Sequence, residues 1–148
     1  MIKREKVIRE AILEDMDRIV KLLYQLSPLK GDADPTKLKA ILEHMLVDSN
    51  YDLIVCECEG NIIGTAALVT IPNLTYGGKS KGLVENVVTD KDNRGKGIGK
   101  KMVEKLIEIG KNKNYYKIIL DCETNNVTFY EKCGFYTTGE VEMRLDMG

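Results

Sequence analysis

A basic, glycine-rich turn between an expected strand and an expected helix constrains the fold of this chain more than any other feature. The turn reads Arg94-Gly95-Lys96-Gly97-Ile98-Gly99-Lys100, after the apolar run 83–89 and before apolar residues at helical spacing over 98–107. Glycine lets a backbone approach a ligand closely, and the first turn of a helix offers N–H groups and partial positive charge to an anion. The cationic side chains around the turn are those of Lys91, Arg94, Lys96, Lys100 and Lys101. These features predict a binding site for a pyrophosphate group.

Other interpretations of this turn fit less well. A dinucleotide-binding turn would explain Asp121, some twenty residues further on, but it needs glycine where Lys100 stands. Its strand would also be buried on both faces, whereas this one carries Glu85. A nucleotide-binding P-loop needs Ser or Thr at the position of Lys101. A flexible basic turn without a ligand is the plain alternative.

Apolar periodicity predicts a single mixed α/β domain over residues 1–148. Helical spacing indicates one helix at 16–26 and a second that begins at Asp34-Pro35, a cap followed by a first-turn proline. Asn126 is expected to cap a short helix that holds Phe129 and Tyr130. Strands are expected at 8–11, 51–58, 62–71, 83–89, 117–120 and 141–145, with a hairpin at 59–61. This order predicts a mixed, mostly antiparallel sheet with helices on both faces.

Composition and charge exclude several classes of protein. Charged residues make up 30% of the 148 residues and apolar residues 43%, as in a globular domain rather than a disordered chain. The formal net charge of −1 does not favour nucleic acid, and no apolar run reaches the roughly 20 residues of a membrane span. With no leader segment recognisable, we expect a cytoplasmic protein without a nucleic-acid or membrane partner. The only histidine is His44, and the four cysteines lack zinc-site spacing, so we expect no metal.

Two motifs, in this order, resemble those of the GNAT acetyltransferase superfamily. Residues 94–99 are similar to its R-x-x-G-x-G loop for the acetyl-CoA pyrophosphate, and 126–135 to its late N-x-x-F-Y-E-K-x-G-F block. Within the superfamily, 116–135 and 141–143 look closest to glucosamine 6-phosphate N-acetyltransferases, and 25–27 is similar to their early substrate-side segment. The resemblance is strongest from Val84 onward. It implies a GNAT-like fold, acetyl-CoA as co-substrate and acetyl transfer to a primary amine.

The resemblance also implies a donor site. The pantetheine arm would lie along the strand that carries Val87 and Val88, and the N–H of one of them would polarise the thioester carbonyl. Tyr130 would stabilise the leaving thiolate as a general acid, although it could instead merely pack beside Phe129. The expected acetyl-CoA contacts are Val87, Val88, Arg94, Gly95, Lys96, Gly97, Ile98, Gly99, Lys100, Asn126 and Tyr130.

The expected acceptor site rests on carboxylates. Glu85 lies in an otherwise apolar strand, where burial would raise its pKa, and it is the leading base or anchor of a water relay. Asp121 resembles the family's amine-facing aspartate. The plain alternatives are an outward-facing carboxylate at Glu85 and a solvated turn at Asp121. The expected acceptor contacts are Ser27, Glu85, Asn86 and Asp121.

Departures from the sugar-phosphate family concern this acceptor. Asn86 stands where that family has a second acidic residue, and Asp146 stands where a phosphate-facing arginine is expected. The stretch 136–140 is one residue longer, so Arg144 could substitute only after a shift of strand register. Lys79 and Lys81 could supply the replacement charge, although a solvated loop is the simpler interpretation of that stretch.

Glucosamine 6-phosphate is therefore the leading acceptor among several. Another amino sugar, a polyamine, an amino acid derivative or a protein amine would suit the same donor site, and an acetyl-CoA sensor without turnover is a further alternative. We also expect a homodimer, because similar sugar-phosphate acetyltransferases pair through their C-terminal strands and 141–145 is a candidate partner strand.

Overall fold

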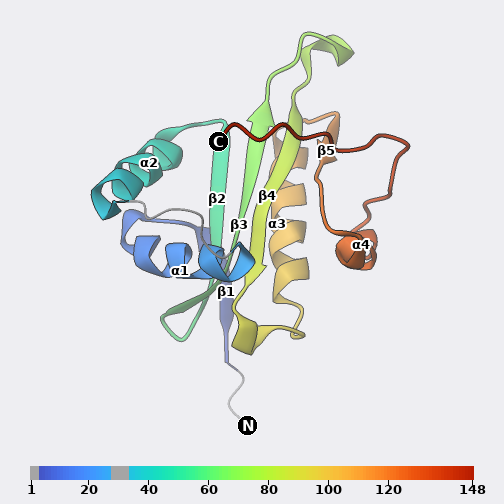
Figure 1. Ribbon diagram of the computed structural model, residues 1–148. Helices are drawn as coiled ribbons and strands as arrows, with labels where there is room; N and C mark the ends of the chain where they lie inside the picture. The colour runs from blue at the N-terminus through green and yellow to red at the C-terminus, as the bar shows by residue number, and fades with distance from the viewer. Residues whose placement is uncertain (1–3, 28–33) are drawn as a thin grey trace.

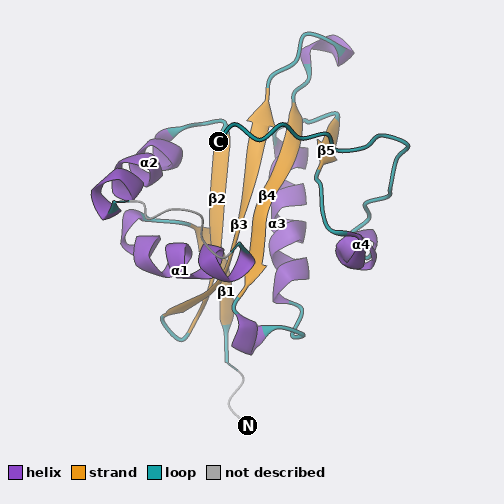
Figure 2. Cartoon of the chain, viewed as in Figure 1, coloured by secondary structure: helices purple, strands orange, loops and turns teal. Residues whose placement is uncertain are grey.

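Five strands form one sheet in the order β1-β2-β3-β4-β5 in the computed structural model, which describes residues 4–27 and 34–148. The first four strands are antiparallel neighbours, and β4 and β5 are parallel. The strands are β1 (Lys6–Glu10), β2 (Tyr51–Cys58), β3 (Asn61–Ile71), β4 (Lys81–Thr89) and β5 (Lys117–Ile119). The expected mixed, mostly antiparallel sheet is confirmed (Figure 2).

Helices cover both faces of this sheet, as predicted (Figure 1). The helices α1 (Met16–Leu26) and α2 (Pro35–Val47) pack on one face, against β3–β4 and β2 respectively. On the other face α3 (Ile98–Asn112) packs on β2, β3 and β4, and the short helix α4 (Val127–Glu131) follows β5. None of the helices in the described ranges combines the length and apolar character that crossing a membrane requires.

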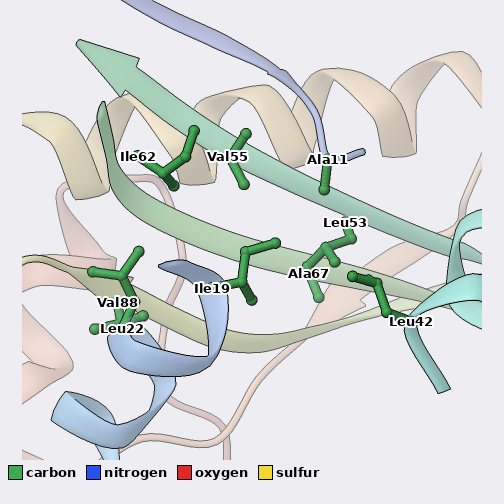
Figure 3. Packing of buried hydrophobic residues seen from close by; sticks show 9 residues of the cluster. All are labelled: Ala11, Ile19, Leu22, Leu42, Leu53, Val55, Ile62, Ala67 and Val88. Carbon is green, nitrogen blue, oxygen red and sulfur yellow. The ribbon is translucent and has the colours of Figure 1, made fainter. Parts of the chain in front are cut away.

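Alternation along the strands produces two separate cores. In β2, Leu53 and Val55 face α1 and α2, whereas Ile54 and Cys56 face α3. Figure 3 shows the first core, in which Ile19, Leu22 and Leu42 from the helices meet Ala11, Leu53, Val55, Ile62, Ala67 and Val88. The sheet is therefore fixed from both sides, and its strands cannot slip without exposing one core to water.

Local capping explains where some helices begin. The Asp34 side chain accepts a hydrogen bond from the Thr36 N–H at 3.0 Å, and Pro35 occupies the first turn, so the predicted start of α2 is confirmed. The prediction for Asn126 is wrong in its detail, because its side chain makes no capping hydrogen bond within the described part of the chain. A 3-10 turn at Thr124–Asn126 leads directly into α4, so the backbone turns into the helix without a side-chain cap.

Two strand predictions are corrected. The first strand is Lys6–Glu10 rather than 8–11. The strand expected at 141–145 is absent among the described residues, where 135–148 has neither helix nor strand. A strand needs a hydrogen-bonding neighbour, and this segment pairs with no strand of the described chain. The apolar side chains Val141, Met143, Leu145 and Met147 are 80–89% exposed.

Gly82 lets Tyr115 close over the start of the parallel β4–β5 pair. A Cβ at position 82 would lie 2.7 Å from the Tyr115 ring and 2.9 Å from Leu68. The hydroxyls of Tyr115 and Thr70 share a hydrogen bond, which restrains the ring. We expect Gly82→Ala to lower the free energy of unfolding by about 1–3 kcal/mol in denaturant titrations. Gly139→Ala, whose Cβ would meet no atom within 4 Å, is the control, and equal stability of the two variants would contradict this account.

Candidate functional site

The parallel pair β4–β5 opens after only three residues. Lys81–Leu83 pair with Lys117–Ile119, after which β5 ends and β4 continues to Thr89. Across residues 4–27 and 34–148, the rest of this edge of β4 has no strand beside it. Unpaired N–H and C=O groups along a strand edge can bind an extended ligand in place of a missing strand.

Hydrogen bonding of β4 distinguishes Val87 from Val88. The Asp90 N–H donates to the Ile63 carbonyl of β3 at 2.8 Å. The backbone N–H groups of successive extended residues point to opposite edges of a strand. The N–H of Val88 therefore points to β3, as that of Asp90 does, and the N–H of Val87 points to the open edge. Of the two candidate donors, Val87 is the one whose N–H is directed to the opening.

A bulge in β4 sets which side chains share a face. The register with β3 shifts between Thr65 and Ala67, which pair with Val88 and Glu85 respectively, so β4 has one extra residue there. Asn86 takes up the bulge with a φ of 53° and is exposed. The bulge places Glu85 on the same face as Val88, the face on which α1 and α2 pack, and Glu85 is half-buried there.

The N-terminus of α3 offers free N–H groups beside the open edge of β4. Gly95 and Gly97 have φ angles of 78° and 79°, which L side chains rarely adopt. The first helical hydrogen bond runs from the Lys101 N–H to the Gly97 carbonyl at 3.2 Å, and no side chain among the described residues caps this end. The N–H groups of Ile98, Gly99 and Lys100 therefore remain available to an anion. The exposed cations Lys91, Arg94, Lys96, Lys100 and Lys101 surround them.

The helix α4 is seated on this same turn. The Phe129 ring lies against Gly99, where an added Cβ would come within 3.2 Å of the ring. Tyr130 packs edge-on against Phe129 and Phe135, with ring centroids 4.8 and 6.0 Å away. Burial raises the pKa of the Tyr130 hydroxyl to about 12, with smaller contributions from Cys122, Cys133 and Asp121. The hydroxyl therefore stays protonated at every ordinary pH and can donate a hydrogen bond.

Carboxylates gather near Glu85. Partial burial is the main reason that the pKa of Glu85 is raised above its usual value, and the charges of Asp121 and Glu142 raise it further. This confirms the direction expected from the sequence. Asp121, which follows β5 by two residues and is exposed, acts on both Glu85 and Tyr130, so the structure brings all three predicted catalytic residues into one region.

Two neighbours of Glu85 were not anticipated from the sequence. Tyr51 begins β2 with a raised pKa, mainly because of burial and also because of the Glu85 charge. Glu142 lies on the C-terminal segment, which crosses the sheet face in Figure 1. Nothing in the local sequence marks either residue, because only the strand register and the path of the C-terminal segment bring them there.

The remaining predicted contacts lie on exposed parts of the chain. Ser27 follows α1 and is exposed, and Asn126 precedes α4 and is exposed. Arg144, the candidate phosphate ligand, pairs with Asp146 at 3.1 Å on an exposed stretch. In residues 4–27 and 34–148, no three His, Cys, Asp or Glu side chains are placed so that they could hold one metal ion.

Comparisons with known proteins agree with this geometry. A family model described as acetyltransferase (GNAT) family matches residues 15–135. The glucosamine 6-phosphate N-acetyltransferase of Trypanosoma brucei brucei is 44% identical over 88 residues, which are 60% of this chain and 59% of that protein. The match thus spans less than two thirds of that relative's length.

Solved structures resemble nearly the whole chain. The glucosamine-6-phosphate N-acetyltransferase from Arabidopsis thaliana superposes with a TM-score of 0.89 at 30% identity, over 97% of this chain and 99% of that one. A structure described as a predicted acetyltransferase with acetyl-CoA, from Clostridium acetobutylicum, has a TM-score of 0.78 at 26% identity over 96% of each chain.

Proposed function

Because this chain belongs to the GNAT acetyltransferase family, we propose that residues 1–148 form one domain that transfers an acetyl group from acetyl-CoA to the primary amine of glucosamine 6-phosphate. The observation that carries the proposal is the open edge of β4, which ends at the uncapped N-terminus of α3. A long ligand with an anionic end fits both features together. The named relatives support the sugar-phosphate acceptor.

The donor binds along this opening. The pyrophosphate of acetyl-CoA accepts hydrogen bonds from the N–H groups of Ile98, Gly99 and Lys100, and the surrounding cations offset its charge. The pantetheine arm then follows β4 as an added strand would, and the Val87 N–H polarises the thioester carbonyl. Holding both substrates in this way removes roughly 7–11 kcal/mol of the barrier to a bimolecular reaction.

The acceptor amine approaches from the face of Glu85. The negative charge of Glu85, Asp121 and Glu142 attracts an ammonium group, and Glu85 takes its proton directly or through water. The neutral amine attacks the polarised carbonyl carbon, and the bond to sulfur breaks as Tyr130 donates a hydrogen bond to the leaving thiolate. The nitrogen gives up its second proton as the amide forms, and the thiolate takes up one proton to leave as CoA.

The phosphate of the acceptor cannot lie among these three carboxylates, because like charges repel. It therefore lies at the opposite end of the sugar from the amine, and we propose Lys79, Lys81 or Arg144 as its cationic partner. The exposed pair of Arg144 with Asp146 is weak enough to be exchanged for a phosphate contact.

The deciding experiment measures thiol release from acetyl-CoA with a panel of amines. We expect turnover with glucosamine 6-phosphate and at least tenfold lower kcat/KM with glucosamine, which lacks the phosphate. Turnover confined to polyamines or amino acids would leave the family intact and overturn the acceptor. Binding of acetyl-CoA without thiol release on any amine would favour a sensor.

We also propose a cytoplasmic location. Acetyl-CoA is an intracellular thioester, and Cys56, Cys58, Cys122 and Cys133 are all free, as is usual in a reducing compartment. Retention of activity in the soluble cytosolic fraction of the source cell is the expected result, and enrichment in another compartment would contradict it.

Finally, we propose a homodimer that covers the C-terminal segment. The exposed residues Val141, Met143, Leu145 and Met147 alternate in sequence, so an extended segment places them on one face. Burying such side chains contributes roughly 1.5–3 kcal/mol each, and a second copy of the chain can supply the missing strand neighbour.

Light scattering at micromolar concentration tests the dimer. We expect twice the chain mass for the wild type and for Glu140→Ser, which changes a polar neighbour on the opposite face. Met143→Asp with Leu145→Asp should give monomers, because two carboxylates cannot be buried unpaired. A monomeric wild type would contradict the proposal.

A further inference from the structure

The Gln25 side chain joins the last turn of α1 to the end of β4. Its Nε2 donates to Asp90 Oδ1 at 2.9 Å, and its Oε1 accepts from the Lys91 N–H, also at 2.9 Å. One amide group therefore holds a side chain and a backbone group at two successive residues. The contact joins positions 65 and 66 residues apart in the chain.

Asp90 is held by more than Gln25. The residue is 7% exposed, and its Oδ2 accepts from Asn93 Nδ2 at 3.0 Å. Arg18 approaches Oδ1 at 3.6 Å and donates to the Ile62 carbonyl at 2.8 Å. The hydrogen bond from Gln25 is the largest cause of the lowered pKa of Asp90, so the carboxylate is ionised at neutral pH. A buried, ionised carboxylate is costly to leave without its donors, which keeps the arrangement in one geometry.

This arrangement lies directly before the glycine-rich turn. Lys91 begins a 3-10 turn that ends at Asn93. Arg94 follows this turn, and its Nε donates to the Thr89 carbonyl at 3.1 Å. The Asn93 N–H donates a hydrogen bond to the Asp90 carbonyl at 2.8 Å. Beyond Arg94, the two glycines with positive φ have no side chains to fix their path. The direction in which the chain enters the turn is therefore set at Asp90 and Lys91.

We propose that Gln25 is a positioning residue for the donor site: by fixing Asp90 and Lys91, it aims the free N–H groups of the α3 N-terminus at the pyrophosphate of acetyl-CoA. The inference rests on the proposed function, because it takes the donor to be acetyl-CoA. Gln25 lies on the opposite face of the sheet from α3 and acts only through Asp90 and Lys91. Its loss should weaken binding of the donor more than it slows the chemical step.

The test compares the dissociation constant for CoA, measured by calorimetry, across four proteins. Gln25→Leu removes both hydrogen bonds. Gln25→Glu keeps an acceptor for the Lys91 N–H, but it places a second carboxylate against that of Asp90, which repels it. We expect both variants to bind CoA about tenfold more weakly, with kcat at saturating acetyl-CoA within about twofold of wild type. Lys21→Leu, on an exposed position one turn earlier in α1, should bind as the wild type does.

A polarity exchange separates positioning from general stability. In the double variant Gln25→Glu with Asp90→Asn, the new asparagine can donate to the new carboxylate, so the hydrogen bond returns with reversed direction. We expect CoA binding to recover to within about threefold of wild type, although each single change weakens it. Melting temperatures recorded on the same samples show whether the fold itself has changed.

The outcomes separate this inference from the proposed function. Unchanged CoA binding in both Gln25 variants, with only a lower melting temperature, would overturn the positioning role and leave the acetyltransferase proposal standing. Failure of the double variant to recover, while its fold is intact, would also overturn it. Failure of the wild type to bind CoA would remove the donor site and the positioning role together.

Discussion

Replacing Tyr130 by phenylalanine should lower kcat by roughly 10²- to 10³-fold while the dissociation constant for CoA changes by less than about threefold. The phenol donates to the sulfur only as the thioester breaks, so the lost interaction belongs to the transition state rather than to the bound substrate. Phe129 and Phe135 still hold an aromatic ring at this position, so phenylalanine preserves the packing. Steady-state kinetics with CoA calorimetry measure the two effects separately.

The raised pKa of Tyr130 refines what the hydroxyl can do. A thiol has an ordinary pKa of about 8.5, and the pKa of Tyr130 is about 12, so complete proton transfer to the thiolate is uphill by about 3.5 pKa units. We therefore expect hydrogen-bond donation and no alkaline loss of activity from Tyr130 below about pH 10. Tyr136→Phe, an exposed residue outside the motif, is the control. A Tyr130→Phe variant with kcat within threefold of wild type would reduce Tyr130 to a packing residue.

Local sequence signals predicted most of the fold. Asp34-Pro35 marked the start of α2, the hairpin after β2 was placed correctly, and the glycine-rich turn gave the start of α3. Each of these features depends on the backbone preferences of a few neighbouring residues, so the local sequence is enough to predict it. The prediction of a strand at 141–145 was wrong because a strand depends on a distant partner rather than on its own residues: it exists only where another strand lies beside it.

The bulge in β4 shows why the site could be predicted only in part. In a regular strand Glu85 and Val87 would share a face, since side chains alternate with a period of two. The extra residue at Asn86 instead places Glu85 with Val88 and puts Val87 on the other face. The pairing of β4 with β3 determines the position of the bulge, and no local sequence pattern predicts it.

Polar contacts between residues far apart in the chain could not be predicted from the sequence for a related reason. The motif resemblance found Tyr130, and an acidic residue in an apolar strand drew attention to Glu85. Gln25 lies in a segment that resembles the family's substrate side, but nothing in the sequence indicates its contact with Asp90. That contact exists only because the fold brings a buried carboxylate within 2.9 Å of the glutamine.

Replacing Glu85 by glutamine should lower kcat/KM at pH 7 by about 10²-fold or more, because glutamine cannot accept the proton of the amine. The wild-type kcat/KM should rise with pH through the raised pKa of Glu85, above the usual range of a glutamate. In Glu85→Gln this rise should vanish and leave only the dependence set by the amine itself, whose ordinary pKa is near 8. Glu123→Gln, an exposed carboxylate near α4, is the control.

Neighbouring charge provides a second, quantitative check of the same assignment. The Asp121 charge helps to raise the pKa of Glu85, so Asp121→Asn should move the acidic limb of kcat/KM toward lower pH without removing it. If that limb stays in place in Glu85→Gln, the group that titrates is not Glu85, and Asp121 or a differently held water becomes the base.

The same raised pKa predicts that Glu85 lowers the stability of the protein. A folded-state pKa above the unfolded value means that the folded protein binds more protons in the pH window between the two values. The free energy of unfolding therefore falls as pH rises through that window, and above it Glu85 is ionised at a cost. Glu85→Gln should consequently melt at the same or a higher temperature than the wild type at pH 7, with the difference shrinking toward pH 4. Lower stability of Glu85→Gln at pH 7 would mean that the carboxylate makes favourable contacts in the fold, and it would weaken the case for a base kept ready to accept a proton.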